Sequence, residues 1–331
     1  MRLPTFARRD ALKLIAAAGL AWPSLAKAQQ PQNGQQPNQP TTAQPPSRFA
    51  YEDVVRRARD LAGLPYEAPR PDLPAALTGM NFDQYRDLRF RPERSLLQQG
   101  GSPFRMQMFH LGFIYRTPVV VNVIRDGIAT PIPYAAALFD YGRNRFERPL
   151  PVDLGFAGFR IHHPLNDPRV QDELVSFLGA SYFRFLGRGQ KYGLSARGIA
   201  VNTAGPGQEE FPVFREFWVE TPQAEAQSCQ IFALLDGESL TGAFRFTVFP
   251  AQETVLDIHC TLFPRRAIPK LGVAPLTSMF FYAENDRRAF DDYRPELHDS
   301  DGLLIHSDTG EWLWRPLRNP RQVEVSQFAD R

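Results

Sequence analysis

Residues 231–263 read IFALLDGESLTGAFRFTVFPAQETVLDIHCTLF. This stretch is the strongest indication of the fold class of the 331-residue chain. Apolar side chains stand at every second position from Phe244 to Val248, which is the period of a β-strand with one face in a core. Asp236-Gly237 is a turn signal after the first apolar run, and a further strand pattern spans Thr254–Phe263. Consecutive strands joined by short turns predict antiparallel pairing.

Similar short runs continue outward in both directions. We expect strands within 104–109 and 119–124, and a hairpin around the turn at 308–310. Such runs, separated by Gly, Pro and Asp, favour a large antiparallel β-sandwich over alternating βα units. Two helices are expected as well: Tyr51–Leu64, which has an apolar stripe, and a weaker one over Val170–Leu178 with acidic residues in its first turn. The predicted class is all-β with a short N-terminal helix.

Charge excludes one class of partner. The net charge is +2, but residues 1–28 carry five basic and one acidic residue, so the remaining chain has 33 basic against 35 acidic residues, a net −2. A nearly neutral chain has no field that holds a nucleic-acid backbone. We therefore predict no nucleic-acid partner.

The sequence of the N-terminal residues predicts an export signal. Arg8-Arg9 precedes a short apolar run, Ala11–Ala21, and Ala26-Lys27-Ala28 has the small-x-small pattern of a cleavage site. The paired arginines resemble a twin-arginine signal over residues 1–28. A disordered linker is expected at 29–47, where seven Gln and five Pro occur among 19 uncharged residues. The folded domain should span 48–331, in the periplasm.

Several sites are excluded by spacing. Residues 193–198 lack the G-x-S-x-G spacing of a nucleophile elbow, and no phosphate-binding loop is present. Six scattered His and two Cys predict no metal site, and nothing predicts a cofactor. An oxidising periplasm would allow Cys229 and Cys260 to pair, but two buried free thiols are also compatible with their positions in separate strands.

Carboxylate and aromatic side chains gather near the C-terminus. Residues 291–301 contain four Asp, one Glu, one Arg and one His, and Trp312 and Trp314 follow. Carboxylates and Arg bind sugar hydroxyls, and aromatic rings stack on sugar faces. Asp299 and Asp301 on an extended strand would lie about 6.6 Å apart on one face, within the range that glycoside hydrolysis uses. A solvated acidic turn, with the two Trp packed in a core, is the alternative.

Ordered motifs carry a family resemblance from about Phe49 to about Phe328. They include LGFAGFR (154–160), LGASYFR (178–184), GQKYGLSARGIA (189–200), YRPELHDSDGL (293–303) and GEWLWRPLRNP (310–320). On these motifs the chain closely resembles the bacterial periplasmic glucan biosynthesis proteins, the MdoG/MdoD family. The twin-arginine-like signal resembles the D member more.

The resemblance implies both fold and function. It implies a galactose-mutarotase-like β-sandwich followed by an immunoglobulin-like domain, and inverting hydrolysis of β-1,2-glucan in the synthesis of osmoregulated periplasmic glucans. Asp299 matches the position assigned as general base. The implied partners are β-1,2-glucan and the inner-membrane glucan synthase. Candidate substrate-binding residues in the motifs are Tyr182, Arg184, Tyr192, Arg197, Arg294, Glu296, His298, Asp301, Trp312 and Trp314.

The resemblance also predicts a truncation. Family members are longer, so the immunoglobulin-like domain and the segment that bears the general acid would be missing after Arg331. Two classes of function therefore stay open. One is an inverting β-1,2-glucanase, and the other is a non-catalytic glucan-binding or assembly factor, less soluble than its longer relatives and without hydrolase activity.

Overall fold

The computed structural model describes residues 48–70, 72–190, 193–205, 207–287 and 291–328. These residues belong to one unit by their contacts, Pro46–Arg331. The predicted signal at 1–28 and linker at 29–47 lie outside the described residues. Within them, no helix is both long and apolar enough to cross a membrane.

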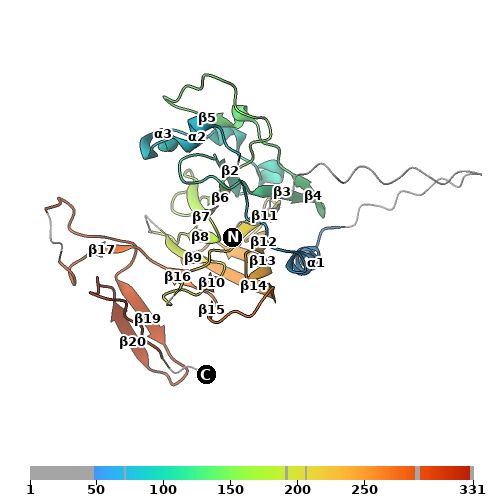
Figure 1. Ribbon diagram of the computed structural model, residues 1–331. Coiled ribbons are helices and arrows are strands. Elements are labelled where there is room, and N and C mark those ends of the chain that lie inside the picture. Colours follow the sequence, from blue (N-terminus) through green and yellow to red (C-terminus); the bar gives the residue numbers. More distant parts are fainter. Residues whose placement is uncertain (1–47, 71, 191–192, 206, 288–290, 329–331) are drawn as a thin grey trace, which may run out of the picture. The chain divides into compact units, whose positions relative to one another are not determined.

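Two six-stranded sheets form the body of the fold (Figure 1). Sheet 1 has the order β14-β13-β12-β11-β3-β4, with bounds β3 Val120–Arg125, β4 Ile128–Pro131, β11 Val213–Glu220, β12 Cys229–Asp236, β13 Leu240–Phe249 and β14 Val255–Pro264. Sheet 2 has the order β16-β9-β8-β7-β6-β2, with bounds β2 Arg105–Phe109, β6 Gly158–His163, β7 Asp172–Leu178, β8 Tyr182–Phe185, β9 Leu194–Arg197 and β16 Leu276–Thr277.

Phenylalanine rings join the two sheets face to face. Phe177 of sheet 2 contacts Phe246 of sheet 1 at a centroid distance of 5.1 Å, and Phe159 contacts Phe217 at 5.0 Å, both edge to face. These rings are almost completely buried. Edge-to-face aromatic contacts contribute beyond the area they bury. The predicted all-β sandwich is confirmed.

Helix α1 (Tyr51–Ala62) covers the other face of sheet 1. Val54 and Ala58 stand four residues apart, lie on one side of the helix, and are fully buried against Trp218 and Phe232. Figure 1 shows this helix beside β13 and β14. Strand β12 in the middle of sheet 1 is therefore buried on both faces, which explains why residues 231–235 are apolar without interruption.

Small elements complete the described chain. The other helices are α2 Ala75–Thr78, α3 Phe82–Arg86, η1 Pro92–Arg94, η2 Gln99–Gly101 and η3 Ala136–Leu138. The remaining strands form four two-stranded sheets: β1 Arg89–Phe90 with β5 Phe139–Asp140, β10 Ala200–Val201 with β15 Leu271–Gly272, β17 Phe280–Tyr282 with β18 Leu297–His298, and β19 Gly302–His306 with β20 Trp312–Pro316.

The helix expected over Val170–Leu178 is wrong. This stretch contains strand β7, which pairs with β6 and β8. Val175 and Phe177 alternate toward the core, and Asp172 accepts hydrogen bonds from the backbone of the preceding loop instead of opening a helix. The acidic residues that suggested a first helical turn are thus the end of a loop, and tertiary pairing overrides local propensity.

One strand pair departs from the antiparallel rule. β3 and β11 are parallel neighbours in sheet 1, although all other pairs in both sheets are antiparallel. Between them the chain crosses to sheet 2, forms β6 to β9, and returns. A parallel pair needs such a long connection.

The cysteines are both free, Cys229 buried and Cys260 half-buried. Register gives the reason, because Cys229 lies opposite Val248 of β13 whereas Cys260 lies opposite Phe244. Four residues along a strand separate these positions by about 13 Å. A disulfide needs Cα atoms within about 7 Å, so this geometry keeps the thiols apart.

Candidate functional site

A row of polar side chains crosses the whole of sheet 2. Residues directly opposite one another in adjacent strands share a face of the sheet. The register places six such residues in line: Gln107, Arg160, Ser176, Arg184, Ser195 and Thr277. Five steps between strands make the row about 24 Å long. We call it the polar row.

The polar row lies on the outer face of the sandwich. Its neighbours along the strands, such as Ile161 and Phe177, point into the core. Hydrogen bonds fix parts of the row: Arg160 donates to Gln107 at 3.0 Å and to the carboxylate of Glu173 at 2.9 Å, and Arg184 donates to Ser195 at 3.1 Å. Guanidinium, carboxylate and hydroxyl groups thus alternate across one surface, which suits a ligand rich in hydroxyl groups.

A second row, two residues further along the strands, is largely apolar. It contains Phe109, Gly158, Leu178 and Tyr182. Gly158 is required there, since a Cβ atom at this position would collide with the backbone carbonyl of Phe177. The missing side chain lets the backbone of β7 approach β6 closely beside the polar row.

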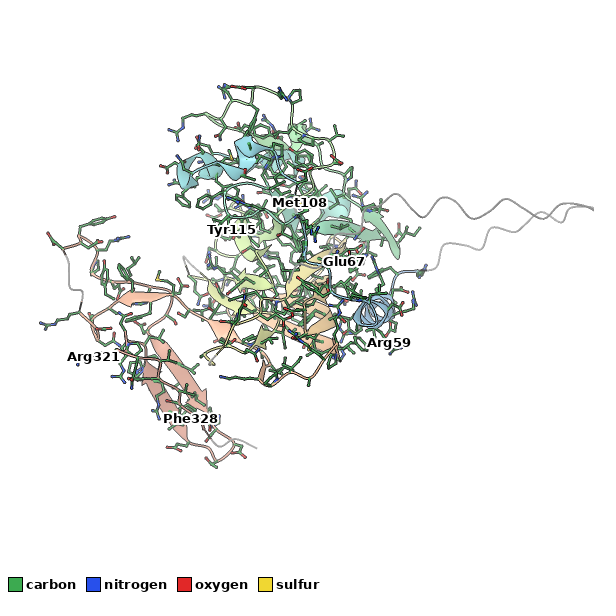
Figure 2. All side chains as sticks on the ribbon, in the orientation of Figure 1. Arg59, Glu67, Met108, Tyr115, Arg321 and Phe328 are labelled. Atoms are coloured by element: carbon green, nitrogen blue, oxygen red, sulfur yellow. The ribbon has the colours of Figure 1, made fainter. Side chains whose placement is uncertain are left out.

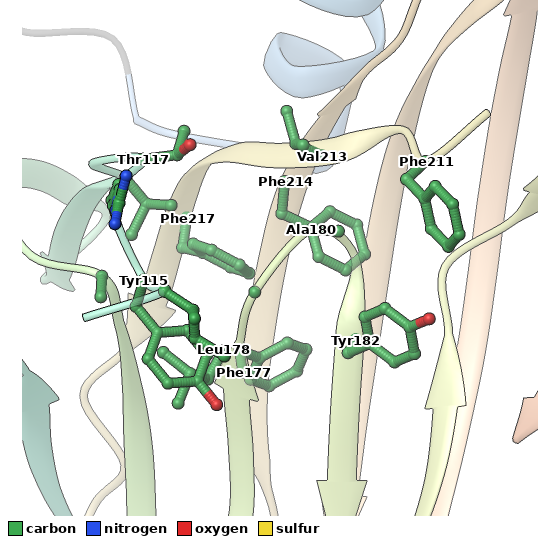
Figure 3. Close-up of a pocket in the computed structure, with 15 residues that line it drawn as sticks. Tyr115, Thr117, Phe177, Leu178, Ala180, Tyr182, Phe211, Val213, Phe214 and Phe217 are labelled. Atoms are coloured by element: carbon green, nitrogen blue, oxygen red, sulfur yellow. The ribbon is translucent and has the colours of Figure 1, made fainter. Parts of the chain in front are cut away.

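Three pockets adjoin one another at these rows, and one of them is also lined by the core rings Phe177, Phe214 and Phe217. A pocket of about 590 Å³ is lined by Tyr115, Glu173, Ser176, Tyr182 and Arg184. It shares Ile114, Tyr115 and Leu178 with a pocket of about 250 Å³ and with a third of about 580 Å³. We call the three together the groove. Figure 3 shows the pocket of about 250 Å³, with Tyr115 and Tyr182 on opposite sides of Phe177, and Figure 2 labels Tyr115 on the ribbon.

Arg197 holds the aromatic wall of the groove rather than its open surface. Its guanidinium lies 5.7 Å from the ring of Tyr182 and 5.4 Å from that of Phe211, and the side chain is 9% exposed. It donates to Glu209 at 2.7 Å and to Thr203 at 3.2 Å. Partial burial raises the pKa of Glu209, but the hydrogen bonds from Arg197 and Thr203 outweigh it and the pKa lies below its ordinary value. Arg197 therefore positions Tyr182.

His110 forms part of the floor of the third pocket. Its Nδ1–H donates to the carbonyl of Leu111 at 2.6 Å, and the hydroxyl of Tyr134 donates to Nε2 at 3.0 Å. Burial lowers the pKa of His110 to about 4, although the bond to Leu111 acts in the opposite direction. The ring is therefore neutral at neutral pH, with both nitrogens satisfied.

Asp299 lies in a bend after β18. Its carboxylate accepts a hydrogen bond from the backbone N–H of Met279 at 3.2 Å, and its own N–H donates to the carbonyl of Met279 at 2.8 Å. Met279 follows β16, whose Thr277 ends the polar row opposite Ser195 of β9. The segment 276–279 thus connects the predicted general base to the edge of sheet 2.

The expected pairing of Asp299 with Asp301 on one extended strand is wrong. Residues 299–301 form a bend between β18 and β19, so side chains two residues apart do not repeat on one face. The carboxylate of Asp301 lies 3.4 Å from Nε2 of His298, and that of Glu296 lies 3.3 Å from the same nitrogen. Asp299 instead faces Met279.

The other predicted residues of this region have partners nearby. Arg294 makes a two-pronged ion pair with Asp292, with contacts of 2.9 and 2.6 Å. Trp312 and Trp314 share one face of the β19–β20 hairpin and are 63% and 49% exposed, so neither is packed in a core within the described residues. Trp312 stacks on His306 at 4.4 Å. Tyr192 lies outside the described residues.

The predicted residues fall into two groups. Tyr182, Arg184 and Arg197 meet on β8 and β9 at the groove, and the residues from 294 to 314 belong to the C-terminal hairpins. Sequence reasoning missed Tyr115, Glu173 and Ser176, which line the groove. The outward positions of 172–178 are a signal for the last two, but the acidic residues at the start of that stretch favour a helix in the sequence alone.

Comparison with known proteins identifies the family. Residues 49–331 match the model of the family described as "Periplasmic glucan biosynthesis protein, MdoG". The chain therefore belongs to this family.

Relatives in several bacteria support the assignment. A glucans biosynthesis protein G of Ralstonia nicotianae is 47% identical over 288 residues, which are 87% of this chain and 57% of the relative. The glucans biosynthesis protein G of Bradyrhizobium diazoefficiens is 50% identical over 85% of this chain and 56% of the relative. The one from a Shewanella species is 48% identical over 85% of this chain and 52% of the relative. The chain spans about half the length of these curated relatives.

Proposed function

We propose that this protein binds the β-1,2-linked backbone of a periplasmic glucan in the groove and hydrolyses it with inversion. The observation that carries the proposal is the polar row, about 24 Å long by strand spacing, flanked by the rings of Tyr115 and Tyr182. An elongated surface of this kind fits several sugar units of one chain, with hydroxyl groups meeting Arg, Glu and Ser while ring faces meet the aromatic side chains.

Asp299 is the base in this proposal. The carboxylate takes a proton from a water molecule while the water oxygen attacks the anomeric carbon, the glycosidic carbon–oxygen bond breaks, and a second acidic group protonates the leaving oxygen. The contact with the N–H of Met279 supports this role, because it holds the carboxylate in one orientation. Membership in a family described as periplasmic glucan biosynthesis protein supports the class of substrate.

Calorimetric titration with linear β-1,2-glucan tests the binding step. We expect Arg184→Gln, in the polar row, to weaken binding about tenfold, equivalent to 1.4 kcal/mol. Arg125→Gln is the matched control, since Arg125 is exposed at the end of β3 in sheet 1. Equal affinities for the two variants and the unchanged protein would remove the groove from the proposal.

Release of reducing ends from the same glucan tests the chemical step. Asp299→Asn should lower turnover by about 10²-fold or more while binding is nearly kept, because the lost interaction acts in the transition state. Non-catalytic binding is the second candidate, and it is favoured by Asp301, whose carboxylate faces His298 rather than pairing with Asp299. Binding without any release of reducing ends would select this second function.

The proposed location is the periplasm, reached by the twin-arginine route. The signal that supports it, residues 1–28, lies outside the described residues. Because paired arginines are read by a receptor, the double variant Arg8→Lys/Arg9→Lys should keep the precursor in the cytoplasm although both positive charges remain. Fractionation and immunoblotting measure this, and normal processing of the double variant would exclude the twin-arginine route.

A further inference from the structure

Three ligand-type side chains converge around β18. Glu296 precedes the strand, His298 ends it, and Asp301 lies in the bend that follows. Nε2 of His298 is 3.3 Å from the carboxylate of Glu296 and 3.4 Å from that of Asp301. The three ligand atoms lie within 4.8 Å of one another. A residue order of E-x-H-x-x-D thus produces a compact triangle of one nitrogen and two oxygens.

Hydrogen bonding alone explains this triangle poorly. A ring nitrogen carries at most one proton, so Nε2 cannot donate a well-formed bond to both carboxylates. Both contacts are also longer than the usual range for an N–H···O bond, about 2.7–3.2 Å. Two negative groups held this close repel each other, and a cation between them would remove the repulsion.

Two of the three ligand spacings match tetrahedral coordination, and the third, between the two carboxylates, is within 4.8 Å. Nitrogen and oxygen ligands lie about 2.0–2.2 Å from Zn²⁺, so two ligands at the tetrahedral angle are about 3.3–3.5 Å apart. The observed 3.3 and 3.4 Å agree with this separation. The side chain of His298 is 10% exposed, and its ring stacks on Phe280 at 5.6 Å with an angle of 16° between the planes. The nitrogen ligand is therefore held in place before any ion binds.

We propose that Glu296, His298 and Asp301 bind one divalent transition-metal ion, with Zn²⁺ as the best match. The carboxylates are 52% and 74% exposed, which leaves an entry path and room for water as a fourth ligand. Nδ1 of His298 is buried without a hydrogen-bond partner among the described residues. A metal-bound imidazole usually donates from its other nitrogen, so we expect weaker binding than at a structural zinc site.

Titration of the metal-stripped, purified protein with ZnCl₂ tests this inference, without glucan. We expect one saturable site per chain and a raised melting temperature with Zn²⁺. Asp301→Asn and His298→Gln should each weaken binding by about tenfold or more, because loss of even an outer-shell partner of a metal ligand costs that much. His306→Gln, on the neighbouring strand β19, is the matched control and should bind like the unchanged protein.

Several results would overturn the site. One is that the protein shows no saturable Zn²⁺ binding. Another is that all three variants bind Zn²⁺ as the unchanged protein does, and a third is that only His306→Gln weakens Zn²⁺ binding. Calcium binding as tight as zinc binding and independent of His298 would exclude nitrogen ligation and likewise overturn it. Asp301 is largely exposed, so Asp301→Asn should keep the fold, and melting of the metal-free variants checks this. Because no glucan is present, failure here leaves the groove proposal intact.

Discussion

The sandwich and the C-terminal β19–β20 hairpin have the same kind of sequence but opposite burial. Phe246 alternates with polar residues in β13 and is fully buried, while Trp312 and Trp314 alternate in β20 and stay 63% and 49% exposed. In the sandwich a second sheet covers the apolar face. The hairpin is a sheet of two strands, which by itself is marginally stable in water. The alternation of residues in a strand therefore does not predict how much that strand contributes to the stability of the protein.

The two regions also hold their charges differently. Asp236 at the end of β12 is fully buried and ion-paired at 2.7 Å with both Arg215 and Arg265. Arg318 and Glu324, after the hairpin, form a 2.6 Å pair of exposed side chains. Burial makes the loss of one partner costly, because the other charge is left without water.

The largest expected effect is on core packing. Phe246→Ala should lower the free energy of unfolding by about 3–5 kcal/mol, because a cavity forms among the rings of Phe177, Phe183 and Phe214. Trp314→Ala removes a larger side chain but should change the free energy of unfolding by about 0.5 kcal/mol or less. Urea unfolding followed by circular dichroism measures both. Similar losses for the two variants would show that the hairpin is packed like the sandwich.

The buried ion pair should give the next largest effect. Asp236→Asn keeps the shape of the side chain but leaves two arginines without their anion, and we expect a loss near the lower end of about 3–5 kcal/mol, since Arg215 can turn to solvent. Glu324→Gln breaks the exposed pair and should cost about 1 kcal/mol or less. The same urea titrations apply, and a large loss in Glu324→Gln alone would reverse the comparison.

Acid should weaken the sandwich through its neutral histidines. The pKa of folded His110 is about 4, below the ordinary 6.5, because burial disfavours the charged ring, and burial lowers the pKa of His162 and His163 as well. The unfolded chain binds more protons between these values, so this stability is present above pH 6.5 and is lost as the pH falls toward 4. His110→Gln should reduce the drop in unfolding free energy between pH 7 and pH 4 by about 2–3 kcal/mol.

Urea titrations at several pH values check the sign and size of this effect. The hydroxyl partners of His110 are Tyr134 and, beyond it, Tyr141, and burial raises the pKa of both, so neither titrates in this range. An unchanged pH dependence in His110→Gln would assign the acid sensitivity to other groups.

The smallest expected effect is on the affinity for glucan, and it distinguishes two aromatic surfaces that could bind the sugar. Tyr182→Ala should weaken binding of linear β-1,2-glucan about tenfold, equivalent to 1.4 kcal/mol, because Tyr182 lines the groove and is held by Arg197. Trp312→Ala should weaken it less, since that ring already stacks on His306. Calorimetric titration of both variants with glucan measures the two affinities. A larger loss of affinity in Trp312→Ala would place the main sugar-binding surface on the hairpin.

Much of the fold was predictable from local patterns. Alternation and turn residues predicted β12, β13 and β14 and the hairpin around Gly310, and an apolar stripe predicted helix α1 within two residues of its observed end. These signals act between residues close in sequence, so they can be read without knowing the fold. The family followed from ordered motifs and is confirmed by the match over 49–331.

Tertiary structure alone decided the pairing of strands and the burial of their faces. The parallel contact of β3 with β11, and the strand at Asp172–Leu178, depend on neighbours far away in the chain. Those neighbours align six polar residues into one row, although the sequence shows only single outward positions.

Sequence patterns alone establish the class of the fold, the position of several strands, the family and the supply of carboxylates near the C-terminus. Only the tertiary structure separated Asp299 from Asp301 and brought Asp301 to His298 and Glu296. The physical reason is that alternation sets which face a side chain takes within a regular strand, whereas a bend such as 299–301 has no period. Its side chains take directions that the packing of other segments imposes.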